Sequence, residues 1–417
     1  MKYGCIGKKL SHSFSKIIHK KIGLYDYELF EIEENRLEDF LLEKNFAAIN
    51  VTIPYKEKVI PFLDYISEEA KNIGAVNTII KKDGNLYGYN TDFLGMKSLI
   101  EKNGIDVKGK KVLVLGSGGT SKTANAVLKA CGADEVITVS RTAGENSISY
   151  ADSIELHNDA QIIVNTTPVG MFPIIDNAPI EIDNFYRLEA IIDAIYNPLR
   201  TVLVSNGIRK NIKAVGGLYM LVAQAFYAAQ FFIDRELDKS IIDKIYNELL
   251  LEKENIVLIG MPGCGKSTIG KILASELGKE FIDSDDEIVW LAKKTIPEIF
   301  EEIGEKGFRE FEAEAIRKIA SRQNCVIATG GGAILNENNV NMLKMNGRVF
   351  FIDRDIEFLV TSDDRPLSSN RELLEKRYAE RYDKYVASCD VIIHASQEIN
   401  ENVSAIKRGF LNENFSN

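Results

Sequence analysis

Residues 260–267 read GMPGCGKS and hold the four fixed positions of a phosphate-binding loop: Gly260, Gly265, Lys266 and Ser267. Four apolar residues, 256–259, precede the loop, and apolar residues at helical spacing follow it, so the motif stands between a predicted strand and a predicted helix. In that setting backbone N–H groups point at phosphate oxygens, Lys266 adds a positive charge, and Ser267 offers a hydroxyl to Mg²⁺. We therefore expect a nucleotide to bind here, with its phosphates held by Gly263, Cys264, Gly265, Lys266, Ser267 and Thr268.

Composition limits the class of protein. The 417 residues are 45% hydrophobic and 27% charged, which is typical of a soluble globular protein with two or three domains. A net charge of −10 argues against a general nucleic-acid or anionic-membrane binder, and no apolar run reaches membrane-spanning length. The five cysteines are widely spaced without a CxxC pair, and the first residues lack a signal-peptide core. We expect a cytoplasmic protein that acts on small molecules, with no nucleic-acid or membrane partner; the sequence leaves its oligomeric state open.

Apolar stretches alternate with helical patterns along the chain, which predicts α/β domains built on open parallel sheets covered by helices. Strands are predicted at 47–53, 111–115, 136–139, 162–165, 190–195, 326–329, 349–352 and 391–394. A first domain spans 1–100 and a second spans 101–217. An amphipathic helix at about 218–237 returns to the first domain, so that residues 218–253 complete it and form the junction. The charged residues 251–254 mark the boundary to the last domain, 254–417.

A dinucleotide-binding turn is predicted after the strand at 111–115, in Gly116, Ser117, Gly118 and Gly119. Ser121 stands where the usual fingerprint has its last glycine. After the next strand, Ser140, Arg141 and Thr142 occupy the place where an NAD site carries an acid. A guanidinium and hydroxyls suit a 2′-phosphate, so NADP is favoured over NAD; an exposed arginine at a strand end is the alternative interpretation.

Lys56 and Asp92 are candidates for proton transfer. Lys56 follows a strand and a proline-fixed turn, and Asp92 lies in the polar cluster Asn90-Thr91-Asp92. Taken separately, the lysine is typical of a solvated surface and the cluster is typical of a helix cap. Taken together with a nicotinamide cofactor they suit ketone reduction, because an ammonium held by a carboxylate polarises a carbonyl and supplies a proton.

These segments, together with Gly74–Thr78 and Gly217–Gln224, stand in the order found in shikimate dehydrogenases, and residues 1 to about 250 resemble that family. The resemblance implies a two-domain dehydrogenase, with an α/β substrate domain and a Rossmann-like NADP domain. It implies that Lys56 and Asp92 are the catalytic pair, and that Gly217 lies at the cofactor. It further implies that shikimate is bound by Ser13, Ser15, Asn50, Thr52, Asn77, Asp92, Tyr196 and Gln224. Ser140 departs from the pattern, since many relatives carry asparagine there.

The last domain carries further candidates for phosphoryl transfer. Asp283 ends a predicted strand and is suited, with Ser267, to the Mg²⁺ shell; Asp285, two residues on, points to the same side of that strand and is a candidate acceptor of the substrate proton. A helix N-cap is a compatible interpretation of the same acids. Arg309 lies in an acid-rich helical segment, where a solvated salt bridge is the ordinary alternative. Other candidates are Gly331 and Gly332 after a strand, Arg365 in a proline turn, and Arg381 on a predicted helix at 376–386.

Residues 255–410 resemble shikimate kinase, a P-loop α/β kinase domain with a parallel sheet. The resemblance implies that shikimate is bound by Asp285, Arg309, Gly331, Gly332 and Arg381, with the arginines on its carboxylate. It implies that Lys266 and Arg365 neutralise charge during transfer from ATP, and that Ser267 and Asp283 hold the metal. The segment between Phe358 and Arg365 departs from the pattern, being short and without the basic residue expected against adenine.

The two resemblances together predict a bifunctional shikimate-pathway enzyme of aromatic amino-acid biosynthesis. The first part would reduce 3-dehydroshikimate with NADPH, and the second would phosphorylate shikimate with ATP and Mg²⁺. Two alternatives stay open. The dehydrogenase could prefer quinate and NAD, or the last domain could be a non-catalytic nucleotide-binding regulatory module.

Overall fold

The computed structural model describes residues 2–10, 14–359 and 371–411. Its internal contacts divide the chain into two compact units, residues 1–248 and 249–417. The division falls inside helix α9 (Ser240–Lys253), a few residues before the charged stretch expected to mark the boundary. Glu254, the last residue of that stretch, is fully buried and forms a salt bridge with Arg348 at 2.8 Å. Each unit is described separately below.

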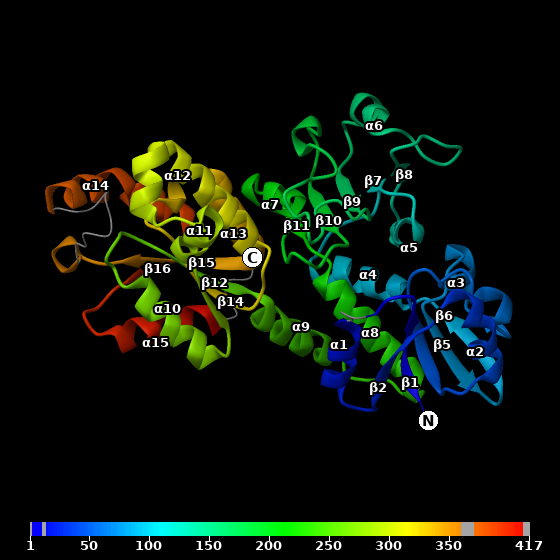
Figure 1. The fold of residues 1–417 in the computed structure, drawn as a ribbon. Helices are drawn as coiled ribbons and strands as arrows, with labels where there is room; N and C mark the ends of the chain where they lie inside the picture. Colours follow the sequence, from blue (N-terminus) through cyan, green and yellow to red (C-terminus); the bar gives the residue numbers. More distant parts are fainter. Residues whose placement is uncertain (1, 11–13, 360–370, 412–417) are drawn as a thin grey trace. The chain divides into compact units, whose positions relative to one another are not determined.

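The first sheet of the first unit has six strands in the order β2-β1-β3-β5-β6-β4 (Figure 1). They are β1 (Tyr3–Gly7), β2 (Tyr27–Glu31), β3 (Ala48–Val51), β4 (Tyr65–Ile66), β5 (Thr78–Lys82) and β6 (Asn85–Tyr89). The expectation of open parallel sheets is wrong here, because β5 runs antiparallel to both β3 and β6. The reversal from β5 to β6 is made by a two-residue hairpin turn, Asp83-Gly84, in which both residues have positive φ, at 51° and 80°. That conformation matches the twist of paired strands and favours Asp-Gly.

Helices cover this sheet and lead into the next domain: α1 (Phe14–Ile22), α2 (Leu37–Glu43), α3 (Glu68–Ile73) and α4 (Thr91–Lys102), with short 3₁₀ turns at Glu34–Arg36 and Ile60–Phe62. Helix α4 begins at Asn90, whose side-chain oxygen accepts a hydrogen bond from Phe93 N. This cap satisfies one of the free N–H groups of the first turn and fixes where the helix starts. Asp92 is thereby held in the first helical turn.

The second sheet of the first unit is wholly parallel, with the order β11-β10-β9-β7-β8. Its strands are β7 (Lys111–Leu115), β8 (Glu135–Val139), β9 (Ile162–Asn165), β10 (Ala190–Asp193) and β11 (Lys213–Val215). Its helices are α5 (Gly119–Ala130), α6 (Tyr150–Leu156) and α7 (Val202–Arg209), with a 3₁₀ turn at Ile182–Asn184. The chain passes to β8 on one side of β7 and to β9 on the other. Ligands of such sheets bind at the carboxyl ends of the strands where the order reverses, which here are β7 and β9.

Helix α8 (Leu218–Ile233) is the expected return helix, and it packs against α4 and α1 (Figure 1). It is shorter than predicted, because Asp234 adopts a left-handed conformation with φ 50° that ends the helix. Most of its residues are buried, which matches its composition of Ala, Phe and Tyr. The helix therefore packs on elements formed by residues 1–102, which is the part of the chain to which it was expected to return.

The second unit is built on a five-stranded parallel sheet in the order β13-β14-β12-β15-β16. Its strands are β12 (Asn255–Ile259), β13 (Glu280–Asp283), β14 (Cys325–Ala328), β15 (Gly347–Asp353) and β16 (Val391–His394). Its helices are α10 (Lys266–Leu277), α11 (Ser284–Ala292), α12 (Ile296–Ala320), α13 (Glu337–Asn346), α14 (Arg371–Ser388) and α15 (Ile399–Leu411), with 3₁₀ turns at Ala333–Leu335 and Ile356–Phe358. β12 lies in the middle and is buried along its whole length, so the loop that follows it leaves from the centre of the sheet.

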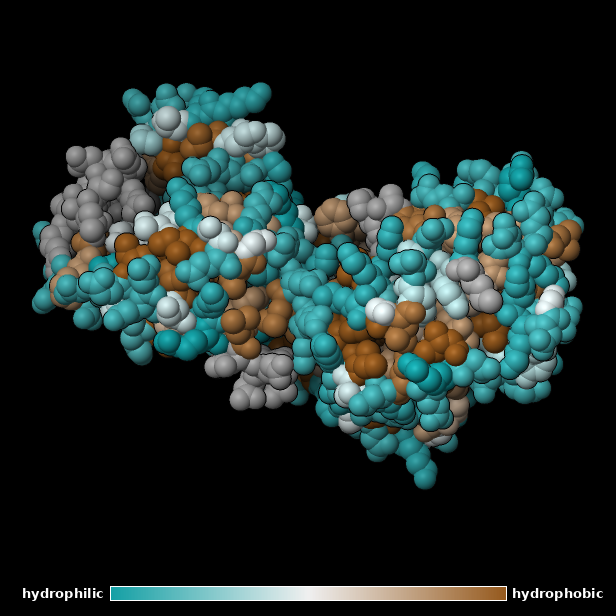
Figure 2. All heavy atoms as spheres, turned by 90° about the horizontal axis from the view of Figure 1, so that it is seen from below, coloured by the Kyte–Doolittle hydropathy of each residue, from teal (hydrophilic) through white to brown (hydrophobic). Residues whose placement is uncertain are grey.

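Hydrophilic side chains occupy most of the face drawn in Figure 2, with smaller apolar areas between them. Among the helices of the described residues, none is both long and apolar enough to span a lipid bilayer.

Candidate active sites

A cleft of about 410 Å³ in the first unit brings together most of the side chains that the sequence singled out there. The predicted residues that line it are Ser15, Asn50, Thr52, Lys56, Asn77, Asp92, Tyr196 and Gln224. They come from α1, the end of β3, the start of β5, α4, the segment after β10, and α8. Ser13 lies outside the described residues. Further residues line the cleft without having been predicted: Cys5, Lys9, Leu10, Phe14, Val51 and Leu221.

Lys56 and Asp92 form an ion pair at the cleft, with Nζ 2.6 Å from Oδ2. Both side chains are partly buried, with exposed fractions of 26% and 18%. Asp92 also lies at the start of α4, where the helix dipole favours a carboxylate. The pair thus presents an oriented ammonium to the cleft, as proton donation to a ketone oxygen requires.

A network of amides and hydroxyls forms the cleft wall behind this pair. Asn50 accepts a hydrogen bond from the Tyr27 hydroxyl at 2.7 Å, and its Nδ2 donates to Thr78 Oγ1 at 3.1 Å. Asn77 Oδ1 accepts from the backbone N–H of Thr91 at 2.7 Å. These bonds fix the orientation of both amides. Tyr27 was not predicted, because a tyrosine in a strand normally indicates only packing.

The turn after β7 has the properties of a phosphate-binding turn. Gly116 has φ 107°, and a Cβ there would lie 2.8 Å from Thr166 Oγ1. Gly118 is the N-cap of α5, and a Cβ at Gly118 or Gly119 would meet nothing within 4 Å. The first glycine is therefore required by close packing against the segment after β9. The two later glycines leave open space at a helix N-terminus, where N–H groups attract anions.

The segment after β8, residues 140–142, begins with a buried residue and continues with two exposed ones. Ser140 is buried, and its hydroxyl donates to Thr142 O and lies 3.1 Å from Ser147 Oγ. Arg141 and Thr142 are exposed. The hydroxyl of Ser140 thus stabilises the turn, and the side chains of Arg141 and Thr142 are open to solvent.

A buried carboxylate that the sequence did not reveal organises the loops beyond β9 and β10. Asp193 accepts hydrogen bonds from Asn165 Nδ2 at 3.0 Å, from Ile195 N at 3.0 Å and from Thr201 Oγ1 at 2.7 Å. Burial raises the pKa of Asp193 to about 6, and these hydrogen bonds partly oppose the shift. Its bonds hold the segment that carries Tyr196 to the cleft.

Gly217, at the start of α8, packs against the same segment. Its N–H donates to Ile195 O at 2.8 Å, and a Cβ there would collide with the carbonyl of Ala194. A side chain at this position would therefore displace the segment.

In the second unit, the phosphate-binding loop connects β12 to α10. Lys266 is nearly buried, and its Nζ donates to Gly260 O and Met261 O, each at 2.9 Å. Ser267 Oγ donates to Asp283 Oδ2 at 2.7 Å. The hydroxyl and the carboxylate predicted to hold Mg²⁺ are therefore adjacent at the carboxyl edge of the sheet.

Asp285 does not extend the strand, as the alternation argument assumed, but lies in the first turn of α11. Asp283 is the N-cap of that helix, and its Oδ1 accepts from Asp285 N at 3.0 Å. The helix-cap interpretation is therefore correct for the backbone. The Asp285 carboxylate faces the loop after β14, because a Cβ at Gly330 would lie 2.7 Å from its Oδ1.

The residues predicted to bind the substrate that accepts the phosphoryl group lie in or beside the loop after β14. A Cβ at Gly332 would collide with the Arg309 guanidinium, and Arg381 Nη1 donates to Gly331 O at 3.0 Å. Arg309 also forms salt bridges with Glu305 and Glu312, at 3.0 and 2.8 Å. Arg309 therefore both forms salt bridges and lies beside the loop after β14, so the two interpretations of this arginine do not exclude each other. Arg365 lies outside the described residues.

Two further residues at this site were not predicted. Glu312 is 1% exposed, its Oε2 accepts from Arg309, and its Oε1 has no partner among the described residues. Burial raises the pKa of Glu312, while Arg309 acts in the opposite direction. The Tyr385 hydroxyl donates to Gly331 O. The sequence carries no signal for either role, because acids and tyrosines on helices are common.

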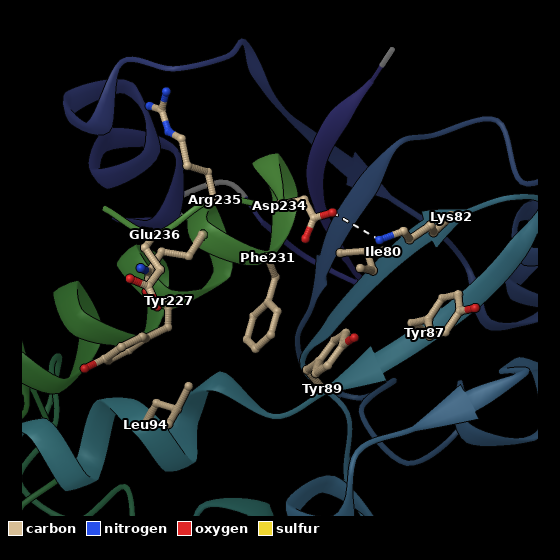
Figure 3. Close-up of a pocket in the computed structure, with 11 residues that line it drawn as sticks. Ile80, Lys82, Tyr87, Tyr89, Leu94, Tyr227, Phe231, Asp234, Arg235 and Glu236 are labelled. Carbon is tan, nitrogen blue, oxygen red and sulfur yellow. Dashed lines mark hydrogen bonds and ion pairs between the residues drawn. The ribbon is translucent and has the colours of Figure 1, made fainter. Parts of the chain in front are cut away.

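A larger cavity of about 670 Å³ in the first unit contains none of the predicted residues. Figure 3 shows Phe231 and Tyr89 close together in it, with their rings stacked 4.2 Å apart. Lys82 and Asp234 pair at its rim at 3.1 Å. Helix α8 contributes to both cavities, with Gln224 at the cleft and Phe231 here.

Comparison with known proteins gives two family matches. The model of the shikimate dehydrogenase substrate binding domain matches residues 5–79, and that of shikimate kinase matches residues 262–408.

Individual relatives cover the first part of the chain. Shikimate dehydrogenase (NADP(+)) of Clostridium beijerinckii is 39% identical over 261 residues, which is 59% of this chain and 96% of that protein. The crystal structure of shikimate dehydrogenase 1 from Peptoclostridium difficile is 38% identical and has a TM-score of 0.54, over 60% of this chain and 98% of that one. The Thermus thermophilus shikimate 5-dehydrogenase in complex with NADP(H) and shikimate is 28% identical and has a TM-score of 0.53, over 60% and 99% of the two chains.

Proposed function

The chain belongs to the shikimate dehydrogenase family and continues into a shikimate kinase domain, and we propose that it catalyses two consecutive reactions on one carbon ring. The first is the NADPH-dependent reduction of 3-dehydroshikimate to shikimate. The second is the ATP-dependent phosphorylation of shikimate at the hydroxyl that the first reaction creates. We assign residues 1–100 to substrate binding, 101–217 to NADP binding, 218–253 to the closing helices and junction, and 254–417 to the kinase.

In the reduction, NADPH supplies a hydride to the ketone carbon. Lys56 donates a proton to the ketone oxygen, and Asp92 holds the ammonium in place, which the 2.6 Å contact between them supports. The fixed amides of Asn50 and Asn77, with Thr52, Ser15, Ser13, Tyr196 and Gln224, orient the hydroxyls and carboxylate of the substrate.

The residues after β7 and β8 fit NADP. Open space over Gly118 and Gly119 at the start of α5 leaves room for a pyrophosphate, and the exposed Arg141 suits a 2′-phosphate. Ser140 stabilises the turn that presents Arg141, since its hydroxyl is bonded within that turn.

In the phosphorylation, ATP supplies the phosphoryl group and Mg²⁺ offsets its charge. Ser267 and Asp283 are adjacent and suit the metal shell, and Asp285 accepts the proton of the attacking hydroxyl. Arg309 and Arg381 bind the shikimate carboxylate, and Lys266 with Arg365 neutralises charge on the transferred group. An arginine pair explains how a chain with a net charge of −10 selects an anionic substrate.

The Lys56–Asp92 contact inside a cleft lined by the other predicted substrate residues is the observation that carries the proposal. The test gives purified protein 3-dehydroshikimate, NADPH and MgATP together, and follows NADPH absorbance and product masses. We expect shikimate 3-phosphate with stoichiometric NADPH oxidation. Shikimate without its phosphate ester would leave a dehydrogenase with a non-catalytic nucleotide-binding module.

A panel of substrates and cofactors tests the remaining alternative, in which the dehydrogenase prefers quinate and NAD. We expect faster turnover of shikimate with NADP than of quinate with NAD, because Arg141 has no role towards the free 2′-hydroxyl of NAD. The reverse preference would refute the NADP assignment. We place the enzyme in a reducing compartment, the cytoplasm, since all five cysteines are free thiols.

A further inference from the structure

Arg354 lies beside the phosphate-binding loop of the second unit. The segment that carries Arg354 contains no recognised motif. Arg354 follows β15 directly, and β15 is the parallel neighbour of β12 (Figure 1). In the register of the two strands, Phe351 pairs with Ile259. Because parallel strands end at the same edge, residues after β15 emerge next to residues after β12. Those residues form the phosphate-binding loop.

The guanidinium of Arg354 reaches this loop. Its Nη1 lies 3.8 Å from the position that a Cβ would occupy at Gly265. Gly265 immediately precedes α10 and adopts φ 99°, as the N-cap of that helix. The arginine therefore stands at a helix N-terminus whose N–H groups and lysine favour an anion.

Arg354 has no acceptor among the described residues. Its Nε is buried and unpartnered, and no hydrogen bond or salt bridge joins its guanidinium to them. The preceding Asp353 is engaged elsewhere, because it accepts from Tyr378 and Tyr382 and lies 3.2 Å from His394 Nδ1. The Arg354 side chain as a whole is half-buried, but a buried N–H without a partner is costly, and an anion held by the loop would supply the missing acceptor.

We propose that Arg354 is a nucleotide-binding residue of this chain, and that its guanidinium donates hydrogen bonds to the phosphate chain of the bound nucleotide. The inference rests on the proposed kinase function, because it assumes that the loop holds ATP. Phosphate oxygens are the matching partner for a planar guanidinium with several donors. Arg354 increases affinity for ATP and ADP and takes no part in binding shikimate.

The test compares the full-length protein with Arg354→Ala, Arg354→Lys and the control Arg408→Ala, which removes an exposed arginine of α15. Titration calorimetry with MgADP measures binding without turnover. We expect Arg354→Ala to weaken ADP binding by about ten- to a hundredfold, the range for a hydrogen bond to a charged group. Arg354→Lys should weaken ADP binding less than Arg354→Ala does, because lysine keeps the positive charge but lacks the planar set of N–H donors of the guanidinium. Arg408→Ala should bind like the wild type.

Steady-state kinetics adds a second readout. We expect KM for ATP to rise in Arg354→Ala while KM for shikimate and the dehydrogenase rate stay unchanged. ADP affinity equal to that of Arg408→Ala would overturn the inference. A loss that affects ATP but spares GTP would also overturn it, because it would assign Arg354 to the base. A wild-type chain that binds ADP but transfers no phosphate would refute the kinase function and leave the Arg354 comparison intact.

Discussion

Lys56 Nζ lies 2.6 Å from Asp92 Oδ2, although the residues are 36 positions apart in the chain. One follows the turn after β3 and the other lies in the first turn of α4. The β5–β6 hairpin between them returns the chain along the same sheet and brings both to one cleft.

Removing either partner should slow the reduction without destroying the fold. We expect Lys56→Met and Asp92→Asn to lower kcat for 3-dehydroshikimate by about 10²- to 10⁴-fold, the usual contribution of a positioned acid. KM should change little in Lys56→Met, because other residues bind the substrate, whereas Asp92→Asn should also raise KM, since the resemblance places Asp92 among the shikimate-binding residues. Lys97→Met is the matched control, since the salt bridge that Lys97 forms within the described part of the chain is an exposed one, with Glu101 at 3.9 Å on α4. Lys56→Met with a rate within tenfold of this control would contradict the assignment.

The kinase reaction should depend on the contact between Ser267 and Asp283. Ser267→Ala removes the hydroxyl that lies 2.7 Å from Asp283, so the Mg²⁺ concentration for half-maximal phosphorylation should rise by about tenfold. EDTA should abolish phosphorylation and leave the dehydrogenase rate unchanged, which serves as the internal control. An unaltered Mg²⁺ titration in the variant would show that Ser267 does not serve the metal.

Gly332→Ala should act through Arg309. The added methyl group would occupy the place of the guanidinium, which is the flexible end of a side chain and moves at small cost to stability. We expect KM for shikimate to rise by about tenfold or more, with ATP affinity unchanged, because a charge-assisted carboxylate contact is lost. Glu305→Ala is the control, because Arg309 keeps its bond to Glu312. An unchanged KM for shikimate would remove Arg309 from the acceptor site.

Asp193 should make stability depend on pH. Burial raises its pKa from 3.8 to about 6 in the folded protein, so the folded state holds the proton more tightly than the unfolded chain. The resulting stabilisation is present below pH 3.8 and is lost as pH rises to about 6, which amounts to roughly 3 kcal/mol.

Asp193→Asn removes this ionisation and keeps the shape of the side chain. Calorimetric unfolding between pH 4 and pH 7 should therefore show a smaller fall in stability for the variant than for the wild type. Parallel curves for the two proteins would contradict a raised pKa at Asp193.

Much of the fold follows from local pattern. The strands at Lys111–Leu115, Ile162–Asn165 and Val391–His394 have the predicted limits. The first two are largely buried, and buried parallel strands are continuous apolar runs between turns. The antiparallel β5–β6 pair was missed, although Asp83-Gly84 carried a recognisable hairpin signal. The first turn of α11 was assigned to the wrong element, because a capping aspartate looks the same in sequence as one on a strand.

The sequence by itself predicted the phosphate-binding loop, the glycine turn and part of the set of polar residues in both candidate sites. These depend on backbone freedom and side-chain chemistry at fixed spacing, which neighbours in the chain already specify. Only the tertiary structure decided that Lys56 meets Asp92, that Asp193 ties the end of β9 to the segment between β10 and α7, and that Arg354 stands beside Gly265 with no acceptor among the described residues. Those relationships arise where strands distant in sequence end at one edge of a sheet. At such an edge, burial and the lack of a hydrogen-bond partner raise the free-energy cost of a polar side chain. Neither burial nor the lack of a partner can be read from the local sequence.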